Sequence, residues 1–166
     1  MSDIDPEAHL QRLCALAPMM VEGTPHAAKL GIKFVSVDIG RATLSLPYTK
    51  IAVGNPATRV VHGGAVTTLL DQACGLAALA GFTRITSTAT LNLSIDYMRA
   101  ATPGETIMAR AHCYKATRHV AFVRAVAFEN DNEDDPVAMA QASFMATPIR
   151  SKNAKKEGPV NNKDAS

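Results

Sequence analysis

Several features are scarce in this 166-residue sequence, and each scarcity argues against a class of protein. Tryptophan is absent and aromatic residues make up only 5%, which weakens an interpretation based on stacked nucleic-acid bases. The net charge is only +2, whereas nucleic-acid-binding domains usually concentrate positive charge on one face. The longest apolar stretch, residues 65–82, is interrupted by polar residues such as Thr68 and Asp71. We therefore expect neither a nucleic-acid partner nor a membrane span.

Cysteine is also scarce. Cys14, Cys74 and Cys113 stand far apart, without metal-ligand spacing, and their odd number argues against a full disulfide framework. The five histidines show no ligand spacing either, so no bound metal and no cofactor are expected. The acidic N-terminus has no basic region leading into an apolar stretch, so a secretory leader is not expected. We interpret the cysteines as reduced thiols of a cytoplasmic protein.

Hydrophobic periodicity predicts an α+β protein. Asp5 and Pro6 mark the start of a short amphipathic helix, which we expect Pro18 to end. A long and almost entirely apolar helix is expected from residue 62 to about residue 80, with Gly81 as its cap. The remaining β-prone segments predict six strands, at residues 32–37, 42–46, 89–96, 106–114, 120–128 and 137–146. Strands grouped around one such helix indicate an antiparallel sheet curled over it.

Two polar stretches complete the organisation. Residues 129–136 are acidic and indicate a solvated hairpin loop, to which we assign no function. Residues 151–166 are polar, carry four lysines and lack periodicity, as is typical of a disordered tail. We therefore divide the chain into an N-terminal helical segment (1–24), a main domain (25–150) and this tail.

The start of the long helix contains the most informative motif. Gly63 and Gly64 follow His62, and amides at a helix N-terminus lack partners and carry positive partial charge. Such amides suit an oxyanion or a phosphate. The alternative for His62 is a structural one, since a histidine before a helix often caps it.

Asp71 is the only charged residue between His62 and Gly81. It lies about two turns after Gly64, and a lone carboxylate in an apolar helix is costly unless it is paired or functional. The alternative is a structural Asp71 that caps backbone or pairs with an arginine. Taken alone, Asn55 indicates a turn and Thr90 an outward-facing strand residue. No GxSxG, Rossmann or P-loop motif is present.

The segment from His62 to Gly64, followed by Leu70 and Asp71, resembles the hotdog-fold thioesterases. The similarity is to the branch that contains phenylacetyl-CoA thioesterase and thioesterase superfamily member 2. Further landmarks of that family extend the resemblance over roughly residues 25–147: Leu30-Gly31-Ile32, Gly40, residues 95–99 and residues 103–105. The resemblance implies a curved antiparallel sheet around the helix at 64–80. It also implies sheets paired edge to edge in a homodimer, often assembled into a homotetramer, with active sites at the dimer interface.

The resemblance also implies roles for individual residues. Asp71 matches the general base or nucleophile, and we leave these two roles open. Gly63 matches the glycine whose amide polarises the thioester carbonyl, and His62 the histidine that orients the site. Thr90 stands where a serine holds the attacking water. Asn55 is the candidate for an upstream loop asparagine, although it lies one residue further from His62 than in the relatives.

The sequence therefore predicts hydrolysis of acyl-CoA to a free acid and CoA. A hotdog dehydratase is disfavoured because its Asp-plus-His pattern is absent. A non-catalytic acyl-CoA sensor is the alternative from another class, although a binder has no need of Asp71 and Thr90. Gly64 and Arg59 are expected to contact substrate. Further candidates for the CoA phosphates are Lys115, Arg118 and Arg124, and small residues that could leave room for the acyl group are Ala57, Ala73, Ala77 and Ala78.

Overall fold

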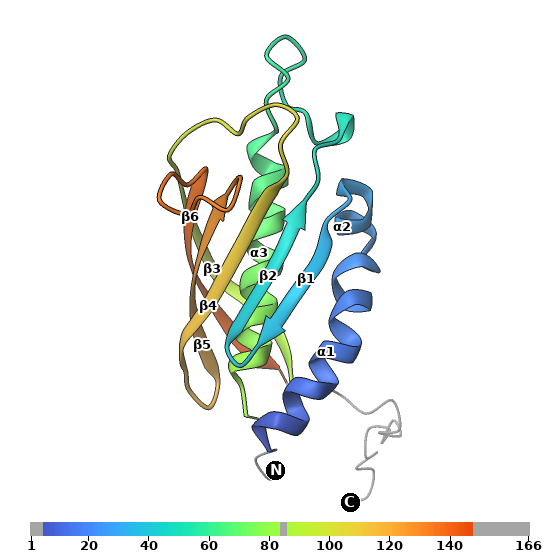
Figure 1. The fold of residues 1–166 in the computed structure, drawn as a ribbon. Helices are drawn as coiled ribbons and strands as arrows, with labels where there is room; N and C mark the ends of the chain where they lie inside the picture. Colours follow the sequence, from blue (N-terminus) through green and yellow to red (C-terminus); the bar gives the residue numbers. More distant parts are fainter. Residues whose placement is uncertain (1–4, 84–85, 148–166) are drawn as a thin grey trace, which may run out of the picture.

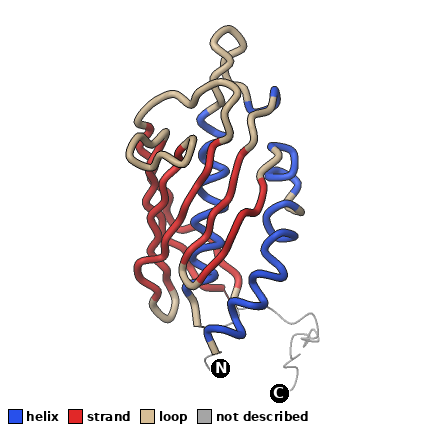
Figure 2. Tube along the Cα trace, viewed as in Figure 1, coloured by secondary structure: helices blue, strands red, loops and turns tan. Residues whose placement is uncertain are grey.

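The computed structural model describes residues 5–83 and 86–147. Within them the chain forms three α-helices, one short 3₁₀ helix and six strands, drawn in Figures 1 and 2. The predicted tail at 151–166 lies outside the described residues. The elements in chain order are α1 (Pro6–Glu22), α2 (Pro25–Leu30), β1 (Lys33–Asp38), β2 (Arg41–Leu46), η1 (Lys50–Ala52), α3 (Gly63–Gly81), β3 (Ser87–Tyr97), β4 (Ile107–Ala116), β5 (Val120–Phe128) and β6 (Ala138–Thr147).

The strands form one antiparallel sheet in the order β1-β2-β4-β5-β6-β3. Helix α3 contacts all six strands, which requires the sheet to curl around it, while α1 lies alongside β1 (Figure 1). The predicted α+β fold, with a curved antiparallel sheet around one long helix, is confirmed. Strands β1 and β3 are the two edges of the sheet.

Alanines make the close wrapping of the sheet possible. Along β6 the buried positions alternate with exposed ones, and most of the buried side chains are alanine. The facing side of α3 is also rich in small residues, with Leu69 and Leu70 as its fully buried large side chains. Because small side chains fill little space, they allow strands and helix to approach closely. The predicted all-round burial of this helix therefore holds for most of its length.

The first helix is longer than the sequence predicted. We expected Pro18 to end it, but α1 continues through Pro18 to Glu22. Ala17 and Val21, on either side of the proline, are fully or almost fully buried in the main core. Their burial favours the continued helix despite the hydrogen bond that a proline cannot donate. Leu13, one turn earlier, packs against Leu79 near the end of α3.

Strand β3 does not alternate as the sequence predicted. The register with β6 shifts between Thr90 and Asn92, so Leu91 is an extra residue in a β-bulge. Leu91 is therefore 54% exposed, whereas Leu93 and Ile95 pack against the core. The bulge reverses which alternate residues of the strand face α3. The side chain of Thr90 therefore faces α3, whereas we had expected it to point outward when we considered that residue alone.

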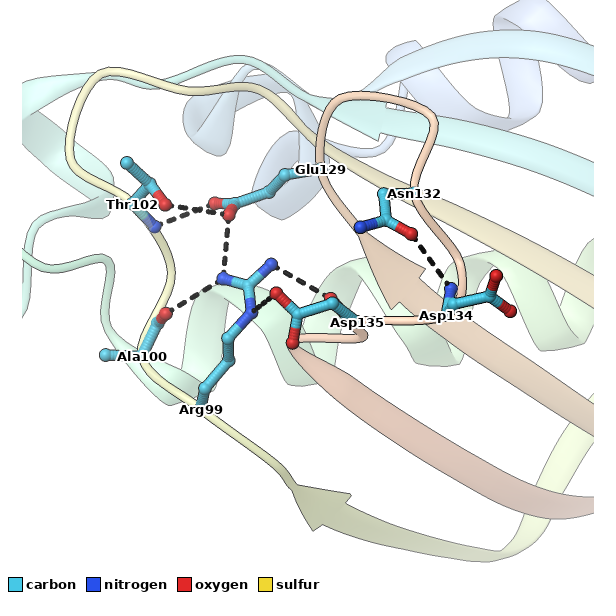
Figure 3. A network of polar contacts seen from close by, with 7 residues as sticks. All are labelled: Arg99, Ala100, Thr102, Glu129, Asn132, Asp134 and Asp135. Atoms are coloured by element: carbon cyan, nitrogen blue, oxygen red, sulfur yellow. Dashed lines mark hydrogen bonds and ion pairs between the residues drawn. The ribbon is translucent and has the colours of Figure 1, made fainter.

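The acidic stretch at 129–136 is only partly the solvated loop that we predicted. Glu129 is 2% exposed, and its carboxylate accepts hydrogen bonds from Arg99 (2.8 Å) and from the amide and hydroxyl of Thr102 (2.8 and 3.0 Å). Arg99 also forms an ion pair with Asp135, as Figure 3 shows. This network joins the segment after β3 to the β5–β6 connection, so Glu129 has a structural role that charge patterning alone could not reveal.

Candidate active site

The carboxylate of Asp71 lies half-buried in the middle of α3, where it meets the bulged strand β3. The Thr90 hydroxyl donates a hydrogen bond of 3.0 Å to its Oδ1. The structure thus brings together two predicted site residues that are 19 positions apart in sequence. Because a threonine oxygen retains lone pairs after donating its proton, Thr90 is still able to accept a hydrogen bond from a water molecule.

Asp71 and Thr90 line a groove of about 230 Å³, here called the Asp71 groove. Its other walls include Met20 from α1, Gly75 from α3 and Phe144 from β6. Among the described residues no cation lies within ion-pair distance of Asp71. Within residues 5–83 and 86–147, the hydrogen bond from Thr90 is the one contact found for this carboxylate, which pairs there with no arginine and caps no backbone amide.

The thiol nearest in sequence to Asp71 is unsuited to nucleophilic chemistry. Burial, together with the neighbouring Asp71 carboxylate, raises the pKa of the Cys74 thiol to about 12. A thiol with such a pKa is almost entirely protonated at neutral pH, and the thiolate is the reactive form. Cys74 therefore belongs to the buried core of α3 and is not a candidate nucleophile.

The predicted oxyanion site lies at the N-terminus of α3. His62 is the N-cap, and its Nδ1 accepts a hydrogen bond of 2.8 Å from the Gly64 amide. The Gly63 amide has no hydrogen-bond partner within residues 5–83 and 86–147. The Gly63 carbonyl, by contrast, accepts from Tyr97 and from Thr67 (2.8 and 3.1 Å). The helix start is thus fixed by neighbouring side chains, and one amide is left available.

The loop before α3 holds the two remaining candidates. Asn55 accepts hydrogen bonds through its side-chain oxygen from the amides of Ala57 and Thr58. It therefore forms a turn, as we expected for this residue taken alone. Arg59 is exposed and adopts a positive φ of 60°, and its carbonyl accepts from Tyr48. Figure 1 shows this loop extending beyond the N-terminal end of α3. Neither Asn55 nor Arg59 forms a hydrogen bond or an ion pair with Asp71 in the described part of the chain.

The predicted residues therefore form two groups within one chain. Asp71 and Thr90 lie at the middle of α3, while His62, Gly63 and Gly64 lie at its start. Asp71 lies eight positions after Gly63 in the helix, a rise of about 12 Å. A groove of about 330 Å³ runs beside the second group and is lined by His62, Gly64 and His26 among others.

Several contributors to these groups were not identified as site residues from the sequence. Tyr97 and Thr67 hold the helix start, and Met20 of α1 closes the Asp71 groove. Tyr97 lay within a segment already noted as a family landmark, which was the available signal. Met20 gave no signal in the sequence, because its position depends on how α1 packs.

In the described part of the chain, no group of three His, Cys, Asp or Glu side chains could hold a metal ion. None of the helices there has the length and apolar character needed to cross a bilayer.

Comparison of the chain with known proteins shows which family it belongs to. Residues 59–135, which contain the helix α3 and strand β3, match the model of the thioesterase superfamily. The medium/long-chain acyl-CoA thioesterase YigI of Escherichia coli K12 is 28% identical over 149 residues, covering 81% of this chain and 94% of that protein. YigI of Salmonella typhimurium LT2 matches over the same shares at the same identity.

Solved structures agree with these sequence matches. The crystal structure of a Pseudomonas aeruginosa protein is 36% identical, with a TM-score of 0.72, and the match covers 80% of this chain and 98% of that one. Escherichia coli PaaI, from the phenylacetic acid degradation operon, shares the fold at 22% identity with a TM-score of 0.71, covering 86% of this chain and 96% of PaaI. The family, fold and enzyme class predicted from the sequence are thus confirmed: the chain belongs to the thioesterase superfamily and has the hotdog fold.

Proposed function

We propose that this protein hydrolyses acyl-CoA thioesters to a free acid and CoA, at sites shared by two copies of the chain. The observation that carries the proposal is the Asp71 carboxylate, which is half-buried, bonded to Thr90, and unpaired with any cation in the described residues. The similarity to YigI, named as a medium/long-chain acyl-CoA thioesterase, supports acyl-CoA as the substrate class and favours medium or long acyl chains.

The chemistry requires a base or nucleophile for the carbonyl carbon and a donor for its oxygen. As a base, Asp71 takes a proton from a water molecule that Thr90 holds, and the hydroxide attacks the thioester carbon. The tetrahedral intermediate then collapses, and CoA leaves as a thiolate that recovers the proton from Asp71. Direct attack by Asp71 is the alternative: the C–S bond breaks, CoA leaves as a thiolate, and an acyl-enzyme anhydride forms. Water then hydrolyses the anhydride to the free acid and the Asp71 carboxylate, and the thiolate takes up the proton that this step releases. In either route the Gly63 amide stabilises the developing oxyanion, an effect worth about 3 kcal/mol.

The spacing along α3 supports a shared site. An oxyanion donor must lie about 3 Å from the oxygen it stabilises, while Gly63 is about 12 Å along the helix from Asp71. One helix therefore cannot supply both groups to a single thioester. A second copy removes the conflict, since its Gly63 is able to approach the Asp71 of the first.

Strand β3 offers the edge at which two copies would meet. It is 11 residues long, occupies the sheet edge, and exposes Leu91 and Tyr97 by 54% and 50%. Antiparallel pairing of two β3 strands about a two-fold axis places the Thr90 half of one opposite the Tyr97 half of the other. Thr90 contacts Asp71 and Tyr97 contacts Gly63, so this pairing would bring the two groups together.

The remaining predicted site residues would support this reaction from the start of α3 and the loop before it. His62 would orient the helix start through its bond to the Gly64 amide, and Gly64 would lie close to the bound thioester. Arg59, on the exposed loop near the same end of α3, would meet the CoA phosphates, and Asn55 would shape that loop. We propose a cytoplasmic enzyme without a cofactor, which forms at least a dimer and assembles further into a tetramer.

The test is CoA release from a panel of short, medium, long and aromatic acyl-CoA esters, followed with a thiol reagent. Wild-type release is expected, and Asp71→Asn should lower kcat by about 1,000-fold because a side chain that transfers the proton contributes 10² to 10⁴. Binding of the esters without release from any of them would replace hydrolysis by the sensor function. An Asp71→Asn rate close to wild type would remove Asp71 from the mechanism.

A further inference from the structure

A second groove, of about 430 Å³, lies between α1 and β3 and is here called the α1–β3 groove. Leu13, Leu16 and Met20 line it from α1, Leu79 from α3 and Thr88 from β3. It exists because the curled sheet does not close around α3: β1 and β3 are opposite edges, and α1 covers only the β1 side. Its volume is within the range of small-molecule pockets, and its walls are mostly apolar.

This groove adjoins the Asp71 groove. Met20, Leu79 and Thr88 line both of them. On α3, Asp71 and Leu79 are separated by two steps of four residues through Gly75, so all three lie on one face of the helix. The path from Asp71 to Leu79 rises about 12 Å along the helix. Gly75 has no side chain to obstruct the path.

The walls of the groove also expose apolar surface to water. Leu16 and Met20, one helical turn apart on α1, are 47% and 40% exposed. Large exposed apolar side chains that flank a concavity mark a surface that binds something apolar. A second copy or a peptide could cover such a surface, but neither accounts for a groove that shares three wall residues with the groove at Asp71.

We propose that the α1–β3 groove binds the acyl chain of the substrate, and that α1 sets the chain-length preference. This inference rests on the proposed function, because the groove starts where that function puts the thioester. The carbonyl group lies at Asp71 and the chain runs past Gly75 toward Leu13 and Leu16. Each methylene buried there raises kcat/KM by about fourfold until the groove is filled. Short acyl chains stop at the Asp71 groove and gain nothing from α1.

The first test fills the groove with a bulky side chain. The readout is the ratio of kcat/KM for dodecanoyl-CoA to that for butyryl-CoA. Leu16→Trp should lower this ratio by about 100-fold, the effect of three to four methylenes. The matched control is Met19→Trp, because Met19 is on the same helix, is 68% exposed, and is not part of either groove wall. Met19→Trp should keep the wild-type ratio.

The second test is independent of any damage that a tryptophan causes. A Cβ at position 75 would lie 3.5 Å from the Phe144 ring and 4.0 Å from the Thr88 hydroxyl, which are ordinary contacts. Gly75→Ala should therefore fold, raise the melting temperature because alanine favours helix, and lower the ratio by about fourfold.

Unchanged ratios in both Leu16→Trp and Gly75→Ala would overturn the groove assignment. A changed sedimentation coefficient in Leu16→Trp, with an unchanged ratio, would also overturn it, because the groove would then be an interface between copies. Failure of the proposed function gives a different result, namely no CoA release from any ester by the wild-type protein.

Discussion

Two carboxylates in this molecule sit in contrasting surroundings. Glu129 is 2% exposed and accepts three hydrogen bonds, one of them from the guanidinium of Arg99. Asp71 is half-buried, accepts one hydrogen bond from the neutral hydroxyl of Thr90, and lines a groove. Burying a charge is costly unless partners replace water. The partners of Glu129 are complete and fix two segments together, whereas Asp71 retains lone pairs for a substrate or a water molecule.

The contrast predicts that substitution of Glu129 mainly lowers stability, whereas substitution of Asp71 mainly lowers activity. Glu129→Gln should lower the free energy of unfolding by about 3 kcal/mol, because it leaves Arg99 without its buried partner. Asp71→Asn should change the free energy of unfolding by no more than about 1 kcal/mol. Urea denaturation of both variants measures the difference. Equal destabilisation by the two substitutions would mean that Asp71 is also a structural charge.

The single hydrogen bond to Asp71 allows a second test of the contrast. Thr90→Val removes the hydroxyl but keeps the branched shape, and kcat should fall by about 10- to 100-fold, as a bond to a charged group is worth 1.5 to 3 kcal/mol. Thr90→Ser restores a hydroxyl at the same position and should recover most of the rate. A serine variant as slow as the valine variant would show that shape, and not the hydroxyl, matters at this position.

A third carboxylate, that of Glu22, extends the comparison to the protein surface. Its substitution should have the smallest effect on stability. Glu22 accepts hydrogen bonds from Lys33 and from the Phe34 amide, and these lower its pKa below the ordinary value of 4.5. A lowered pKa in the folded state means that the stabilisation is present above about pH 4.5 and is lost as the pH falls through the folded pKa. The stability difference between wild type and Glu22→Gln should therefore shrink on acidification. A difference that grows at low pH would contradict this assignment.

Most of the fold followed from local patterns in the sequence. The apolar length of α3 was sufficient because this helix is buried along most of its length, as its composition indicates. Pro18 and Leu91 misled the predictions for the opposite reason. The helix continues through Pro18 because Ala17 and Val21 are buried by distant segments, and the bulge at Leu91 depends on pairing with β6.

The candidate site was predicted unevenly for similar reasons. Asp71 was visible as a lone charge in an apolar helix, and Gly63 as part of a glycine pair at its start. The contact between Thr90 and Asp71 could not be derived from periodicity, because the bulge reverses the phase of β3. The contribution of Met20 to the groove walls was not visible at all, since it depends on how α1 packs against α3.

The shared site can be tested with a pair of variants that damage its two halves separately. Asp71→Asn removes the carboxylate, and Gly63→Pro removes the amide proton. Proline is tolerated at the first position of a helix, and the ψ of 132° at His62 suits a residue before proline. Gly63→Ala is the control, since it adds a similar Cβ close to Tyr97 but keeps the amide.

The most direct measurement is the thioesterase rate of Asp71→Asn and Gly63→Pro chains produced together in the same cells. If each site takes Asp71 from one copy and Gly63 from the other, a mixed dimer regains one intact site of its two. Random association then restores about a quarter of the wild-type rate, although each variant alone is inactive. A co-produced mixture no more active than the separate variants would contradict a site shared between two copies.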